Sequence, residues 1–193
     1  VLFGTILGTL VALLRLSRCK VFQALTGAYI EVLRGTPILL QLYFFWLLLP
    51  KVLPFKVSDT ACIIVALVIN SSSYVAEVIR AGIQAVDKGQ MEAAKSLGLS
   101  NKNAMRYVIL PQAVKNILPT LGNEFIALIK ETSVVSFVGA ADLYVAFNYI
   151  GSNSYEFMVP YLVMAAIYIV LVLVISILVK LMERSLKKSD RRH

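Results

Sequence analysis

Residues 92–111 read EAAKSLGLSNKNAMRYVILP, a polar and charged stretch in a chain whose other long segments are mostly apolar. The chain has 193 residues, of which 59% are hydrophobic and only 16% are charged. This composition is outside the range of ordinary soluble domains and is typical of membrane proteins. A membrane helix needs about 20 mainly apolar residues. We therefore expect residues 1–193 to form one all-α integral membrane domain with five transmembrane helices.

Five apolar segments fit this expectation. The predicted spans are residues 1–14, 38–49, 60–80, about 112–131 and 156–182. The second is expected to end at Pro50, and Pro111 and Pro119 are expected to interrupt the fourth. The first is short by an outer turn or two. Residues 21–34 are amphipathic, which predicts an interfacial or cytoplasmic helix that ends at Arg34-Gly35-Thr36-Pro37. Gly4 and Gly8 form a Gly-x-x-x-Gly pair, which either lets another helix approach closely or occurs by chance.

The basic residues are distributed unevenly along the chain. Of the 19 Lys and Arg residues, all but Lys51, Lys56 and Lys130 lie after the first span, around residues 92–111, or in the tail. Cytoplasmic loops carry an excess of Lys and Arg. The chain is therefore predicted to be a multi-pass plasma-membrane protein with its N-terminus outside and its C-terminus cytoplasmic. This topology accounts for the net charge of +8 without a nucleic-acid partner.

Several classes of chemistry have no support in the sequence. Cys19 and Cys62 lie far apart and the one histidine is His193, so we expect no metal site and no cofactor. The sequence contains no Gly-x-x-x-x-Gly-Lys-Ser/Thr run for binding ATP, and no His-Glu-x-x-His or Gly-x-Ser-x-Gly run of an intramembrane enzyme. We therefore expect no catalytic residues in this chain.

Polar residues recur at helical spacing in the third and fourth predicted spans. Such groups are costly in a membrane and usually face a cavity or a partner, so we predict a shared aqueous pocket with substrate-binding residues Asn70, Ser73, Tyr74, Glu77, Asn123 and Glu124. For Glu77 two interpretations stay open. Its carboxylate either binds a cationic substrate, or pairs with Arg80 one turn away or with a neighbouring helix and holds the bundle together.

The polar stretch has a specific spacing: Glu-Ala-Ala, three residues, Gly, nine residues, then Ile-x-Leu-Pro, with Val108 at the Ile position. It resembles the cytoplasmic signature loop of ABC importer permeases. The resemblance implies the type I importer permease fold and a coupling loop at about residues 87–111 that binds a separate ATP-hydrolysing subunit. The residues that match the motif and would make this contact are Glu92, Ala93, Ala94 and Gly98. The helix-start cluster that opens with Asp87 and the cap residue Ser100 predict two short helices here, with a bend at Gly98.

Three further segments resemble the polar amino-acid branch of these permeases, the histidine, arginine and glutamine type. They are Arg34-Gly35-Thr36-Pro37 with Gln41, residues 74–82 and residues 123–133. The resemblance implies import of polar amino acids delivered by an extracytoplasmic binding protein. Among these substrates we favour basic ones such as arginine. The resemblance also implies two ATPase chains and a second permease chain, identical or a close paralogue. The alternative, an ATP-independent secondary transporter or channel, gives the signature loop no function.

Overall fold

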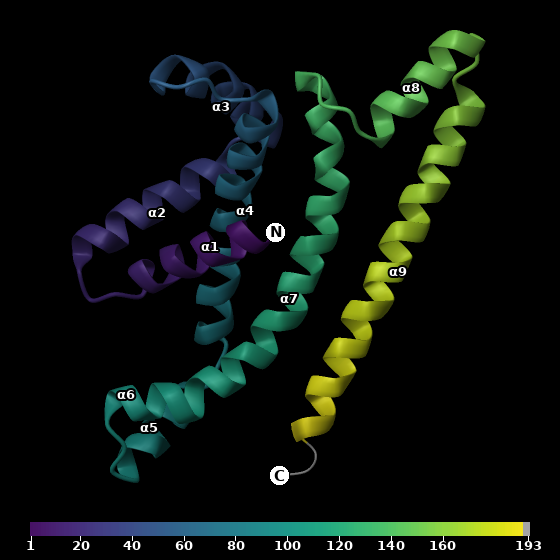
Figure 1. The fold of residues 1–193 in the computed structure, drawn as a ribbon. Helices are drawn as coiled ribbons and strands as arrows, with labels where there is room; N and C mark the ends of the chain where they lie inside the picture. Colours follow the sequence, from purple (N-terminus) through teal and green to yellow (C-terminus); the bar gives the residue numbers. More distant parts are fainter. Residues whose placement is uncertain (191–193) are drawn as a thin grey trace.

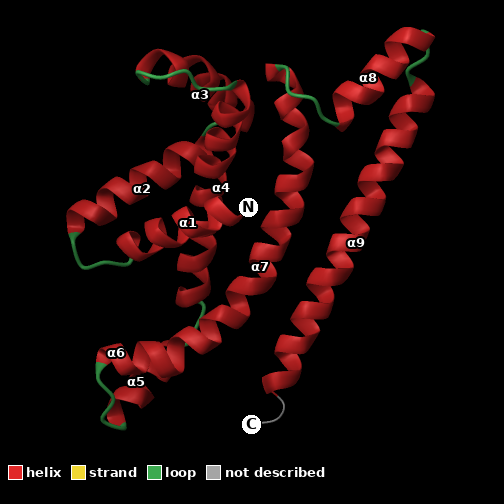
Figure 2. Cartoon of the chain, viewed as in Figure 1, coloured by secondary structure: helices red, strands yellow, loops and turns green. Residues whose placement is uncertain are grey.

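A computed structural model describes the backbone of residues 1–190 and the side chains of residues 1–184. The described chain consists of helices joined by short loops and contains no strand (Figure 2). In chain order its elements are α1 (Leu2–Arg15), α2 (Lys20–Gly35), α3 (Ile38–Val52), α4 (Asp59–Gln84), α5 (Lys88–Ser96), α6 (Asn101–Ala104), a π-helical segment (Met105–Ile109), α7 (Leu110–Glu131), a 3₁₀ segment (Thr132–Val138), α8 (Leu143–Ser154) and α9 (Met158–Asp190). The side chains of the predicted basic tail beyond Arg184 lie outside the described residues.

Local sequence signals set the starts of several helices. Ser58, which precedes α4, accepts a hydrogen bond from the backbone N–H of Ala61 at 3.3 Å. Asp87 caps α5 in the same way through the N–H of Gly89, at 2.6 Å. Because these short side chains satisfy N–H groups that have no partner inside the helix, each one favours a helix start at that position.

Helix α4 is the centre of the bundle. Helices α1, α2, α3 and α7 all pack against it, whereas α9 packs on α7. Figure 1 shows α5 and α6 at the end of the molecule where α9 finishes, and α3 and α8 at the opposite end. The fold therefore separates the coupling loop, residues 87–111, from the ends of α3 and α8 by the length of α4 and α7.

The predicted spans are all helical, but they differ in how they could cross a membrane. Two helices are each long and apolar enough to cross a membrane alone. They are α4 and residues Met158–Arg184 of α9. Two pairs of helices are bent at a short break, and each pair could form one further span. One pair is α2 with α3, bent by 110°, and the other is Asn101–Val138 with Leu143–Ser154, bent by 56°. Helix α1 is apolar but shorter, as the sequence predicted.

Two expectations about proline are wrong. The second span was expected to end at Pro50, yet α3 continues to Val52. The fourth was expected to be interrupted at Pro119, yet α7 runs through it. Proline removes one backbone hydrogen bond, and membrane helices accommodate this loss when neighbouring groups satisfy the freed carbonyl.

The glycine pair on α1 allows this helix to approach α4 closely. Gly4 and Gly8 are both buried against α4. A Cβ atom on Gly8 would lie 2.6 Å from Cβ of Val75 and 2.7 Å from the carbonyl oxygen of Ser72. Of the two interpretations of this pair, the structure supports close approach, because a larger residue would push α1 away from α4.

We expect Gly8→Ala to destabilise the protein, because the added methyl group overlaps Val75 and the backbone at Ser72. Overpacking of this kind costs about 1–3 kcal/mol, which a lower midpoint of thermal unfolding in detergent would report. Gly35→Ala is the matched control, since a Cβ atom there has no neighbour within 4 Å. Equal midpoints for the two variants would contradict the close contact.

Candidate substrate path and coupling surface

Asn70 and Ser73 lie on α4 in the middle of the bundle. Both are buried, with 4% and 0% of their surface exposed. The Ser73 hydroxyl donates a hydrogen bond to the carbonyl oxygen of Asn70 at 2.7 Å, so its polarity is satisfied within the helix. The Asn70 side-chain oxygen is buried and accepts no hydrogen bond within the described chain. Asn70 therefore retains an unused acceptor at membrane depth.

Glu77, one to two turns further along α4, is the centre of a charged cluster that we define as Arg34, Glu77, Arg80 and Gln84. Arg80 donates to Glu77 through two guanidinium nitrogens, one of them Nε at 2.9 Å from Oε2. It also donates to the side-chain oxygen of Gln84 at 2.6 Å. Both carboxylate oxygens of Glu77 therefore accept from the same guanidinium, a geometry that gives strong and directional ion pairs.

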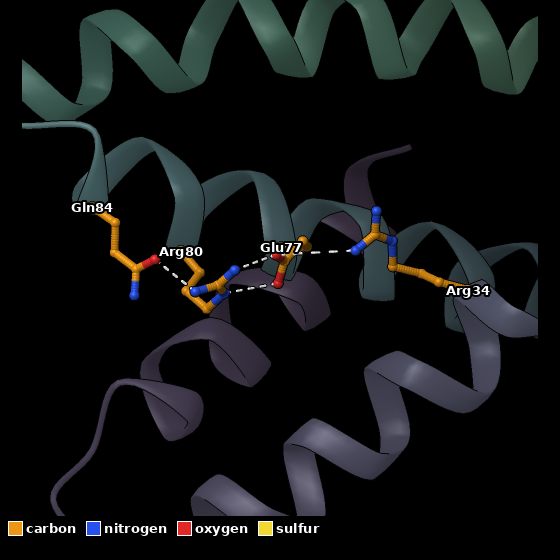
Figure 3. Close-up of polar contacts among 4 residues, drawn as sticks. All are labelled: Arg34, Glu77, Arg80 and Gln84. Carbon is orange, nitrogen blue, oxygen red and sulfur yellow. Dashed lines mark hydrogen bonds and ion pairs between the residues drawn. The ribbon is translucent and has the colours of Figure 1, made fainter.

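Arg34 approaches the same carboxylate from another helix. Figure 3 shows Glu77 between Arg80, on its own helix, and Arg34, at the end of α2. Nη1 of Arg34 lies 4.0 Å from Oε1 of Glu77. The guanidinium also lies over the Tyr74 ring, 5.5 Å from its centroid, where the electron-rich face of the ring attracts a cation.

An open cavity of about 260 Å³ adjoins the charged cluster. Its lining residues are Arg15, Gly27, Ile30, Glu31, Arg34, Glu77 and Arg80. Three guanidiniums and two carboxylates border this space, so it presents both signs of charge. A zwitterion can be bound by such a surface, with its carboxylate near a guanidinium and its ammonium near a carboxylate.

The predicted residues of α7 are less enclosed. Asn123 is exposed and Glu124 is half-buried, and neither side chain makes a hydrogen bond within the described chain. Helices α4 and α7 are held close at Gly82, where a Cβ atom would lie 2.3 Å from Cγ1 of Ile117. The two polar stripes thus lie on adjacent helices. Among the described residues no hydrogen bond or ion pair joins Asn123 or Glu124 to the charged cluster, although Glu124 is near enough to Arg34 to interact with it electrostatically.

The coupling loop has the shape that its sequence predicts. Helices α5 and α6 are separated by Gly98, whose φ of +84° is a conformation that glycine adopts readily. Glu92 and Ala93 are exposed, while Ala94 is buried against the bundle. Leu97, just before the glycine, has 84% of its surface exposed. The loop therefore presents a small surface that combines a carboxylate with an unpaired apolar side chain.

Two residues of these sites were absent from the predicted set. The sequence places Arg34 at the end of a helix and in a segment that resembles the family, but does not predict it as a site residue, since its approach to Glu77 depends on how α2 packs against α4. The sequence signal for Arg34 is its position directly before the Gly-Thr-Pro break. A cationic side chain at the end of a helix beside such a break can point toward a neighbouring helix. Leu97 was missed although a leucine in a polar loop is itself a signal of a contact surface.

Comparison with known proteins identifies the family. Residues 4–188 match the family of the binding-protein-dependent transport system inner membrane component. The arginine transport system permease protein ArtQ of Bacillus subtilis is 40% identical over 189 residues, which cover 98% of this chain and 86% of ArtQ. A putative glutamine transport system permease protein, GlnP of Rickettsia conorii, is 38% identical over 96% of this chain and 85% of its own length.

Solved structures share the fold. A chain from an amino acid ABC transporter crystallised with histidines has a TM-score of 0.87 and 49% identity, over 95% of this chain and 85% of that chain. A chain of the inward-facing MetNI methionine ABC transporter has a TM-score of 0.76 at 19% identity, over 96% and 88% of the two chains. The protein is thus a membrane permease with the type I ABC importer fold. It belongs to the family of binding-protein-dependent transport system inner membrane components.

Proposed function

We propose that this chain is the membrane subunit of an ATP-driven importer of polar amino acids, and in particular of basic ones such as arginine. The observation that carries the proposal is the charged cluster, which sets a carboxylate and two guanidiniums beside an open cavity on α4. The names of the relatives support the same class, since ArtQ is an arginine permease and GlnP a putative glutamine permease.

In this proposal the substrate is recognised by the two kinds of charge in the cluster. The α-carboxylate binds the Arg34 guanidinium, which has the larger exposed fraction of the Arg34–Glu77 pair, 44% against 24%. The cationic end of the substrate binds the Glu77 carboxylate, as Arg80 does in the structure. The remaining polar residues of the path, which are Asn70, Ser73, Tyr74, Asn123 and Glu124, offer hydrogen bonds as the substrate moves.

The coupling loop would bind a separate ATP-hydrolysing subunit. Glu92, Ala93 and Leu97 are exposed there, so a groove on the partner can bury the leucine and pair with the carboxylate. Two such permease chains would work together, identical or close paralogues, and an extracytoplasmic binding protein would deliver the amino acid. The N-terminus would lie outside and the coupling loop in the cytoplasm, as the distribution of Lys and Arg predicts.

We expect Glu92→Arg to abolish co-purification of the ATPase subunit, because the change reverses the charge at an exposed contact of α5. The matched control is Glu131→Arg, which makes the same change at the exposed far end of α7. Affinity purification of the tagged permease, followed by detection of bound ATPase, measures the effect. Retention of the ATPase by the Glu92 variant would refute this contact.

We expect Glu77→Gln to weaken uptake of arginine far more than uptake of glutamine. The variant loses the charge that binds a guanidinium but keeps a hydrogen-bonding side chain of the same size. A charge-assisted hydrogen bond contributes about 1.5–3 kcal/mol, so KM for arginine is expected to rise about tenfold or more. Initial rates of uptake by membrane vesicles that contain the complete transporter provide the measurement.

The same experiment separates the two interpretations of Glu77. If the carboxylate serves only to hold Arg80 and the bundle in place, the variant loses uptake of arginine and glutamine to the same extent. Equal losses would therefore remove Glu77 from the substrate site and leave it as a structural ion pair.

A further inference from the structure

The 110° bend between α2 and α3 originates in the sequence Gly35-Thr36-Pro37. Proline has no backbone N–H. In an unbroken helix the N–H of residue 37 would bind the carbonyl oxygen of Leu33, four residues earlier. Pro37 leaves that carbonyl without its normal partner inside an apolar protein, where an unsatisfied polar group is costly.

Gln41 supplies the missing donor. Its side-chain nitrogen lies 2.7 Å from the carbonyl oxygen of Leu33. The same nitrogen lies 3.1 Å from the carbonyl oxygen of Thr36 and 2.8 Å from its hydroxyl. The Thr36 hydroxyl donates in turn to the carbonyl oxygen of Val32 at 2.8 Å. Gln41 has 6% of its surface exposed and its bond to Leu33 is buried, so that bond does not compete with water.

These bonds fix the direction in which α2 ends, and Arg34 lies in that last turn. The described contacts of its guanidinium are Glu77, at 4.0 Å, and the Tyr74 ring. Neither contact is short enough to fix the position of this long side chain by itself. The position of Arg34 therefore depends on the backbone that Gln41 holds.

We infer that Gln41 is a positioning residue for substrate binding, which keeps the Arg34 guanidinium beside Glu77, ready for the carboxylate of the amino acid. The inference rests on the proposed function, in which the charged cluster binds the substrate. Gln41 itself touches no part of the cluster in the described contacts. Its effect on the substrate passes through the bend and through Arg34.

The test is the kinetics of L-arginine uptake by membrane vesicles that contain the complete transporter. Gln41→Leu removes the amide and keeps a side chain of similar size. We expect KM to rise about tenfold, as for loss of one hydrogen bond to a charged group, while kcat stays within about twofold. An unchanged KM, or a fall in kcat with KM unchanged, would overturn the inference.

A double-mutant cycle tests whether Gln41 affects substrate binding through Arg34. Arg34→Gln alone is expected to raise KM as Gln41→Leu does, and the double variant is expected to raise it no further, because both changes remove the same interaction. Effects that multiply in the double variant would show that Gln41 does not act through Arg34. If neither Arg34→Gln nor Glu77→Gln changes KM, the proposed substrate site fails, which is a different outcome.

A milder pair of variants tests the same inference if the Gln41→Leu variant does not assemble into a complete transporter. Thr36→Val removes one acceptor of Gln41, together with the bond to Val32. Thr26→Val is the matched control, because the Thr26 hydroxyl donates within α2, to the carbonyl oxygen of Phe22 at 2.6 Å. We expect a rise of a few-fold in KM for Thr36→Val alone. An equal KM for the two variants would overturn the inference.

Discussion

Polar groups buried in this bundle have to find their partners within the protein, because lipid hydrocarbon offers no hydrogen bonds. Short hydroxyls meet the requirement inside a single helix, as Thr9 does by donating to the carbonyl oxygen of Thr5 at 2.7 Å. Longer side chains meet it between helices. The Tyr29 hydroxyl on α2 lies 2.6 Å from the Ser72 hydroxyl on α4. Each such bond fixes one helix relative to another, so the polar residues of the chain determine which helix faces meet.

The features that the sequence predicts correctly depend on neighbours close in the chain. The caps at Asp87 and Ser100 and the bend at Gly98 follow from the chemistry of single residues. The two errors at Pro50 and Pro119 have a common cause. The rule that proline ends a helix describes the cost of one missing hydrogen bond, and the packing of a membrane bundle outweighs that cost.

In the candidate site, too, some positions follow from neighbours close in the chain and others depend on how helices pack. Asn70, Ser73, Tyr74 and Glu77 belong to one helix, so the helical period alone places them at neighbouring positions on α4. Arg34 belongs to another helix, and its approach to Glu77 needs both the bend at Pro37 and the packing of α2 on α4. Gly35-Thr36-Pro37 predicts a break between α2 and α3 but not its angle of 110°, because the angle also depends on contacts across the break, such as the bond from Gln41 to the carbonyl oxygen of Leu33.

The coupling loop and the charged cluster lie in different parts of the molecule, so any influence of one on the other has to pass through packed side chains. The apolar cluster of Val86, Ile109, Ala113 and Ile117 provides such a connection. It joins the chain just after α4 to the π-helical segment and to α7, and Met91 of α5 packs against it. Because a close-packed interior transmits displacement and does not absorb it, a movement of α5 would carry α4 and α7 together. Helix α2 is joined to α4 in turn by the apolar cluster of Val11, Ala12, Ile30 and Ala76 and by the hydroxyl pair of Tyr29 and Ser72. The packed side chains of α4 are therefore the connection through which a movement of the coupling loop would reach the charged cluster.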